Sequence, residues 1–132
     1  MKKYSFFLPL FLTAALFGQT HSFTFSLGIN DTMPVLRLST DGTFPCKGYS
    51  IQVHQAWSKD TVIIYIRGFR RPYPCIDGME PATAETRLTG IERKRVEMQF
   101  RYEGVTDRWR VTAGKSGYSA TPVQNSFTLF EE

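Results

Sequence analysis

Apolar residues recur at every second position along most of this chain, and this period of two limits its fold more than any other feature of the sequence. The clearest case is Arg95–Tyr102, where Val96, Met98 and Phe100 alternate with charged or amide side chains. The same alternation occurs in the segments 23–27, 36–38, 49–57, 108–113 and 127–129. Because successive side chains of a strand point to opposite faces of a sheet, these segments are predicted to be half-buried β-strands.

One segment differs from the others. Thr61–Phe69, TVIIYIRGF, is apolar on both faces as far as Ile66, as expected for a central strand of a sheet. Turn-forming residues separate the strands, at Asn30-Asp31, Asp41-Gly42, Ser58-Lys59-Asp60, Glu103-Gly104 and Gly114 to Gly117. Seven or eight short strands at this spacing predict an all-β domain, either a sandwich or a small barrel. The one candidate for a helical turn is Pro81–Glu85, PATAE.

A first hairpin is predicted between Tyr49–Trp57 and Thr61–Phe69, which a short Ser-Lys-Asp turn separates. Cys46 and Cys75 fall near the open end of this hairpin, slightly out of register. Two cysteines in an exported chain most simply form a disulfide, so we expect a Cys46–Cys75 bond that staples the base of the hairpin. The chain-entropy model gives roughly 3–4 kcal/mol for closing a loop of about 30 residues.

A second hairpin is predicted between 95–102 and 106–113, and two registers remain open for it. A turn at Glu103-Gly104 sets Phe100 opposite Asp107, which places a ring against a carboxylate. A turn one residue later sets Arg101 opposite Arg108, and like charges directly opposite each other are destabilising. The sequence alone does not favour either register of this hairpin.

The N-terminus has the layout of a secretory signal peptide. Lys2 and Lys3 precede an apolar run, Phe6–Phe17, that is shorter than a membrane span. Residues 1–22 are therefore expected to be a signal peptide cut between 18 and 22, and 23–132 to be a single exported β-sandwich domain. The lysine-led signal indicates a bacterial protein of the periplasm or the extracellular space. An uncleaved membrane anchor or a buried strand is the alternative; after cleavage the chain is not expected to span a membrane.

Charge and motifs argue against several functions. The net charge of +4 includes Lys2 and Lys3, and the mild remainder does not favour nucleic acid. No phosphate-binding glycine motif occurs, and no cofactor is expected. A metal site is not expected either, because His21 and His54 are the only histidines and the chain has no C-x-x-C pair.

Catalysis is not expected. If the signal peptide is removed at or near His21, His54 is the one histidine left, and it lies on the polar face of its strand. No two acidic residues share an apolar context that would shift a pKa, and the acidic side chains are all predicted to be solvated surface (Glu80, Glu85, Glu92, Glu97, Glu103 and Asp107). The arginines are interleaved with these carboxylates, which is typical of a solvated sheet face whose charges pair with each other.

The segment Gly68–Pro81, GFRRPYPCIDGMEP, contains the residues that favour a contact surface. Arg70, Arg71 and Tyr73 are of the types enriched at interface hot spots. The neighbouring prolines would hold the segment extended at a low entropic cost. These three residues are the predicted binding residues.

The order PCKGYSIQV, TVIIYIRG, PYPC, EPATAE and YEGVTDRWRV, over Cys46–Val111, resembles small, uncharacterised, exported bacterial proteins with an Ig-like β-sandwich. Cys46 precedes Trp57 by the spacing found in Ig domains, but Cys75 follows that Trp too soon to make the Ig core disulfide. The resemblance implies an antiparallel Ig-like sandwich of about seven or eight strands with one disulfide. It supplies no catalytic residues.

Together these features predict a non-catalytic exported module that binds a protein or an envelope polymer, as a monomer or a weak oligomer. Two alternatives stand beside this prediction. One is a small hydrolase that uses His54 with a neighbouring carboxylate. The other is a structural subunit of an envelope assembly, in which another chain covers Ile63 and Tyr65.

Overall fold

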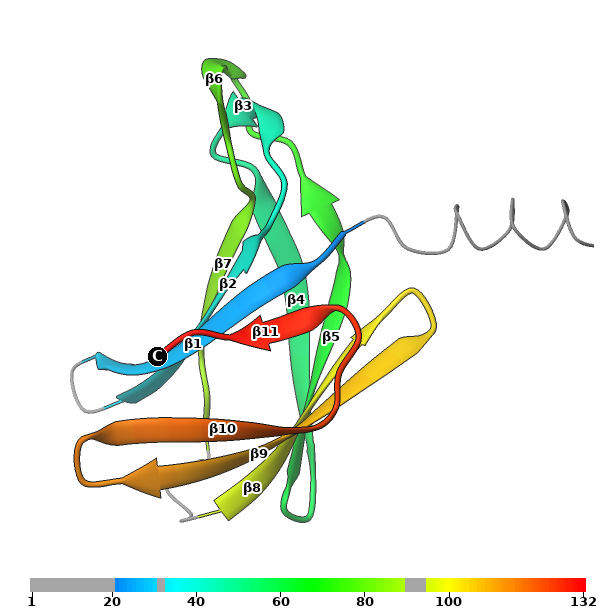
Figure 1. Cartoon of the computed structure of the whole chain (residues 1–132). Coiled ribbons are helices and arrows are strands. Elements are labelled where there is room, and N and C mark those ends of the chain that lie inside the picture. Colours follow the sequence, from blue (N-terminus) through cyan, green and yellow to red (C-terminus); the bar gives the residue numbers. More distant parts are fainter. Residues whose placement is uncertain (1–20, 31–32, 90–94) are drawn as a thin grey trace, which may run out of the picture.

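The computed structural model describes residues 21–30, 33–89 and 95–132 (Figure 1). In these residues the chain forms eleven strands: β1 (Phe23–Asn30), β2 (Met33–Thr40), β3 (Phe44–Lys47), β4 (Ser50–Ser58), β5 (Thr61–Arg70), β6 (Ile76–Glu80), β7 (Thr83–Arg87), β8 (Arg95–Tyr102), β9 (Val105–Gly114), β10 (Gly117–Gln124) and β11 (Thr128–Phe130). The predicted all-β class is confirmed.

A search of this described part for a helix long and apolar enough to cross a membrane finds none. The predicted signal peptide up to Thr20, the residues Asp31 and Thr32, and the segment 90–94 with Glu92 lie outside the described residues.

Nine strands form one sheet in the order β10-β9-β8-β5-β4-β7-β2-β1-β11, and β3 pairs with β6 in a separate two-stranded sheet. The large sheet curls into a nearly closed barrel (Figure 1). This differs from the predicted Ig-like sandwich of seven or eight strands. The physical reason is a parallel pairing of β5 with β8, from Thr61↔Glu97 to Tyr65↔Arg101, which joins the two halves through one continuous hydrogen-bonded ladder. Alternation along the sequence gives the faces of each strand but not its neighbours.

The inward faces of the strands form one hydrophobic core. The larger fully buried side chains are Phe23, Phe25, Leu36, Val62, Ile64, Leu88, Met98 and Phe100. In β5 the residues Val62, Ile64 and Ile66 are buried, whereas Ile63 and Tyr65 on the outer face are half-buried. This strand lies between β4 and β8, so the prediction of a central strand is confirmed.

Both predicted hairpins are present. β4 and β5 pair antiparallel from Ser58↔Thr61 to Ser50↔Arg70, with one bulge between Gln52 and Val53. β8 and β9 pair with Phe100 opposite Asp107, which resolves the open register in favour of the turn at Glu103-Gly104. Both turn residues have positive φ, 49° and 79°, the backbone that tight two-residue hairpin turns require.

Asp107 corrects one prediction. Its register puts it on the inward face of β9, where it is fully buried rather than solvated. The carboxylate accepts hydrogen bonds from the backbone N–H groups of Ser126, Phe127 and Thr128, each at 2.9 Å, and from the hydroxyls of Ser126 at 3.0 Å and Thr128 at 2.6 Å. We call this set of contacts the Asp107 knot. It ties the chain just before β11 to the inside of the barrel, and it provides the partners that a buried charge requires.

The prediction of a helical turn at Pro81–Glu85 was wrong. This segment enters β7, which pairs antiparallel with β2 from Val35↔Arg87 to Ser39↔Thr83. Ala82 is buried, and the Ala82 N–H donates to the Thr40 hydroxyl at 3.0 Å. Pairing with β2 satisfies the backbone more completely than one isolated helical turn would.

Candidate functional site

The two-stranded sheet projects from one end of the barrel (Figure 1). We call β3, β6 and the connecting segment 71–75 the tip. Cys46 and Cys75 form a disulfide with their Cα atoms 5.4 Å apart, so the predicted bond is confirmed. It joins β3 to the residue before β6, at the open end of the β4–β5 hairpin as expected.

Aromatic rings join the tip to the barrel. The Phe44 ring lies 4.7 Å from the Tyr49 ring and 4.9 Å from the Phe69 ring, between ring centroids. Phe69 in turn stacks on Phe23 in the core at 6.2 Å. The ring of His21 packs on the Phe44 and Phe69 rings, with centroids 5.5 and 4.8 Å away. The base of the tip is therefore continuous with the packed interior.

The far part of the tip exposes large apolar side chains. Tyr73 is 99 % exposed, Met79 66 % and Ile76 59 %. Arg71 beside them is also exposed. Exposed apolar side chains gathered on one projection are the usual sign of a contact surface.

The three predicted binding residues lie at the end of β5 and in the loop that follows it. Arg71 and Tyr73 lie together in the loop of the tip that ends at Cys75. Arg70 ends β5 and lines a different feature, a cleft beside β4 and β7. Arg71 and Tyr73 belong to the tip, which also carries the exposed Ile76 and Met79.

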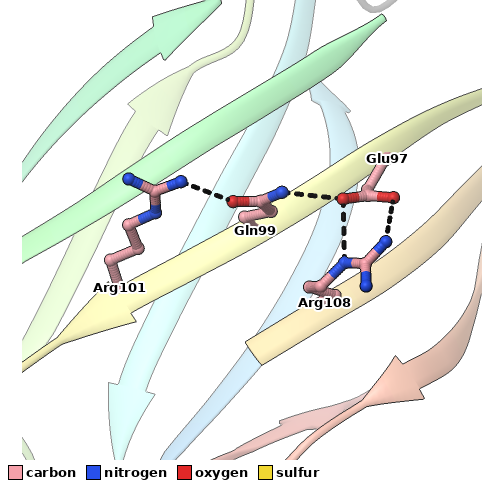
Figure 2. Close-up of polar contacts among 4 residues, drawn as sticks. All are labelled: Glu97, Gln99, Arg101 and Arg108. Atoms are coloured by element: carbon pink, nitrogen blue, oxygen red, sulfur yellow. Dashed lines mark hydrogen bonds and ion pairs between the residues drawn. The ribbon is translucent and has the colours of Figure 1, made fainter. Parts of the chain in front are cut away.

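A row of polar side chains crosses the outer face of β8 and β9 (Figure 2). The Arg108 guanidinium donates two hydrogen bonds of 3.1 Å to the two oxygens of Glu97. The Gln99 amide donates to Glu97 at 2.7 Å and accepts from Arg101 at 3.0 Å. We call these four residues the polar row.

The polar row continues on to β5 and β4. The Arg101 guanidinium lies 5.6 Å from the centre of the Tyr65 ring, and that ring lies 6.2 Å from the imidazole of His54. The hydrogen bonds from Arg108, and then from Gln99, hold the pKa of Glu97 below its usual value. These side chains satisfy one another, which confirms for this part of the chain the predicted sheet face whose charges pair internally.

Two other acidic side chains of the barrel, Glu85 and Asp107, also have partners. The Glu85 carboxylate forms a 2.7 Å ion pair with the Arg37 guanidinium on the outer face of β7 and β2. The Asp107 carboxylate accepts the hydrogen bonds of the Asp107 knot. His54 is exposed on the outer face, where Tyr65 is its cross-strand neighbour. In the described ranges no group of three or more His, Cys, Asp or Glu side chains is placed to hold a metal ion.

The cleft that Arg70 lines has a volume of about 960 Å³. Its residues come from five neighbouring strands, β1, β2, β7, β4 and β5, and from the C-terminal segment: Thr24, Phe25, Ser26, Arg37, Leu38, Ser39, Ser50, Ile51, Gln52, Val53, Arg70, Thr83, Ala84, Glu85, Thr86 and Glu131. Two of these strands, β4 and β7, share a single residue pair, Ser50↔Thr83. Sequence reasoning missed this cleft, since nothing in the alternation indicates that β4 and β7 are neighbours.

No protein-family model, curated protein or solved structure matches this chain.

Proposed function

We propose that this protein is an exported bacterial binding module without catalytic activity, whose tip is the contact surface for a partner protein. The observation that carries the proposal is the exposure of Tyr73, Met79 and Ile76 on one projection. Burying such side chains against a partner removes apolar area from water, which stabilises a complex by about 25 cal/mol per Å² before the costs of association. Aromatic residues, Met and Arg are also the types enriched in protein interfaces.

The contacts that anchor the tip to the barrel support this proposal. The disulfide and the ring contacts of Phe44 hold the base, and the Glu80 carboxylate accepts a 2.8 Å hydrogen bond from the Gly48 N–H between the two strands. A contact surface that is already ordered loses less conformational entropy on binding. Because the tip is narrow, we infer a concave partner that receives it rather than a flat one.

Export is part of the proposal. The disulfide suits an oxidising compartment, and the lysine-led apolar N-terminus suits a secretory signal. We propose that the signal is cut before His21, within the predicted range of 18 to 22. The packing of the His21 ring on Phe44 supports this, as does the 3.0 Å hydrogen bond from the Asp41 N–H to the Ser22 carbonyl.

The test is site-specific photo-crosslinking in the cell envelope of the producing bacterium. A photo-reactive amino acid at Tyr73 should give a defined cross-linked band, whereas the same amino acid at Val123 should not. Val123 is a matched control because it is an exposed apolar residue, 45 % exposed, on β10 of the barrel. The same band at both positions, or no band at Tyr73, would contradict the proposal.

A further inference from the structure

We propose that the gap between β4 and β7 binds an extended peptide, which adds a strand to the sheet there. We call this gap the seam. The inference does not depend on the proposed role of the tip.

The seam is a weak point in the sheet. β4 and β7 are parallel neighbours whose ladder consists of one pair, Ser50↔Thr83, next to a 3.2 Å hydrogen bond from the Thr83 N–H to the Tyr49 carbonyl. Every other pair of neighbouring strands in the described part of this sheet shares at least three residue pairs. Strand edges that lack a neighbour present N–H and C=O groups that can pair with an added strand.

Both strands of the seam line the cleft described above. Its lining includes the consecutive residues 50–53 of β4 and 83–86 of β7. The lining also includes consecutive residues of β1 and β2, 24–26 and 37–39, although both of those strands are paired on both edges, so the open edges are inferred from the single residue pair between β4 and β7. The volume of about 960 Å³ is within the range of ligand sites, roughly 300–1,000 Å³.

The side chain of Gln55 already pairs with a backbone carbonyl at the edge of β7. Its side-chain N–H donates to the Arg87 carbonyl at 2.6 Å, across the end of the seam that is remote from Ser50. In this contact a carboxamide takes the place of the peptide group of a neighbouring strand. The Oε1 atom of Gln55 is buried and has no hydrogen-bond partner in the described structure, so this amide can accept a donor as well.

The chemistry of the lining favours a peptide over a sugar. The one aromatic residue of the lining, Phe25, is fully buried, so the cleft offers no exposed ring on which a sugar could stack. The inward-facing residues Val53 and Ala84 are small and half-buried, whereas Arg37 and Glu85 lie on the outer face. The peptide should therefore alternate small apolar residues, which face inward, with polar residues, which face outward.

The probe is a phage-displayed library of random eight-residue peptides, selected on the intact mature chain. Selected peptides should show the alternation, and they should bind at least tenfold more weakly to the Gln52→Trp variant, whose ring would fill the cleft. His54→Trp is the matched control, because His54 is an exposed outward residue of the same strand that does not line the cleft. Binding to this control should be unchanged.

A second measurement locates the peptide and keeps the test independent of the tip. Backbone amide signals of 51–55 and 84–87 should shift and become protected from hydrogen exchange on binding, whereas those of the tip should not. Methylating alternate backbone nitrogens of the peptide should reduce binding at least tenfold, because an added strand needs its N–H groups. Failure to select any peptide, equal binding to both tryptophan variants, or shifts confined to the tip would overturn the inference. A chitin oligosaccharide that shifts the seam signals when no peptide does would also overturn it.

Discussion

The Asp107 knot and the tip differ in how deeply their side chains are buried. The knot buries a carboxylate among five donor groups inside the barrel, whereas the tip leaves Tyr73 almost fully exposed. A buried charge is tolerated only when its partners are in place, so the knot contributes to the stability of the barrel. An exposed tyrosine contributes little to stability, which leaves it available for a partner. The difference separates residues that serve the fold from residues that are free to serve a function.

The largest effect is expected from Asp107→Ala. This change leaves the N–H groups of Phe127 and Thr128 buried without their acceptor, and it should lower the free energy of unfolding by about 3–5 kcal/mol. Urea denaturation measures the loss. The matched control is Asp77→Ala, an exposed aspartate of the tip, which should change stability by less than about 0.5 kcal/mol. Similar small losses for both variants would remove the contrast between knot and tip.

The next effect is loss of the disulfide, through Cys46→Ala with Cys75→Ala. The bond joins residues 29 positions apart, and the chain-entropy model gives a destabilisation of roughly 3–4 kcal/mol. Hydrogen exchange should show the largest loss of protection in β3 and β6. Loss of protection spread evenly over the barrel would show that the tip is not a separately held unit.

The third effect concerns the two tryptophans, of which only Trp109 is hydrogen-bonded to the Asp107 knot. The Trp109 indole N–H donates to the Thr128 hydroxyl at 2.9 Å, which in turn donates to Asp107. The indole N–H of Trp57 is buried without a partner among the described residues. Trp109→Phe should therefore cost about 1–2 kcal/mol more than Trp57→Phe, because it also removes a hydrogen bond of the knot. Equal losses in thermal denaturation would mean that this hydrogen bond adds no net stability.

A smaller effect is expected from acid. Because the pKa of Glu97 is lowered in the folded state, its pairing stabilises the protein above the ordinary glutamate pKa. This contribution is lost as the pH falls through the lowered pKa. The Glu97→Gln variant should therefore show a slightly flatter decline of melting temperature below about pH 5 than the parent chain. A decline identical to that of the parent would show that the polar row of Figure 2 contributes no pH-dependent stability.

The smallest effect on stability is expected at the tip itself. Arg71→Ala and Tyr73→Ala remove exposed side chains, so each should change the free energy of unfolding by less than about 0.5 kcal/mol. The same variants should abolish the cross-link to the partner when the photo-reactive group is placed at Ile76. A large drop in melting temperature would assign these residues to the fold instead.

The sequence alone determined the local features of this protein. Alternation located most of the strands and separated the buried Val96, Met98 and Phe100 from their outward neighbours. The cysteine pair and the Ser-Lys-Asp turn were sufficient to predict the disulfide and the first hairpin. These features depend on side-chain periodicity, turn chemistry and compartment, all of which are readable over short stretches of chain.

Tertiary structure decided what depends on distant partners. The buried position of Asp107 follows from its alternation with Trp109 and Val111, but the donors that make it tolerable come from residues 126–128. The nine-stranded sheet depends on the parallel pairing of β5 with β8, and the seam on the single pair between β4 and β7. Strand neighbours are chosen by the packing of the whole chain. For that reason the sequence predicted the tip's loop but not the cleft that Arg70 lines.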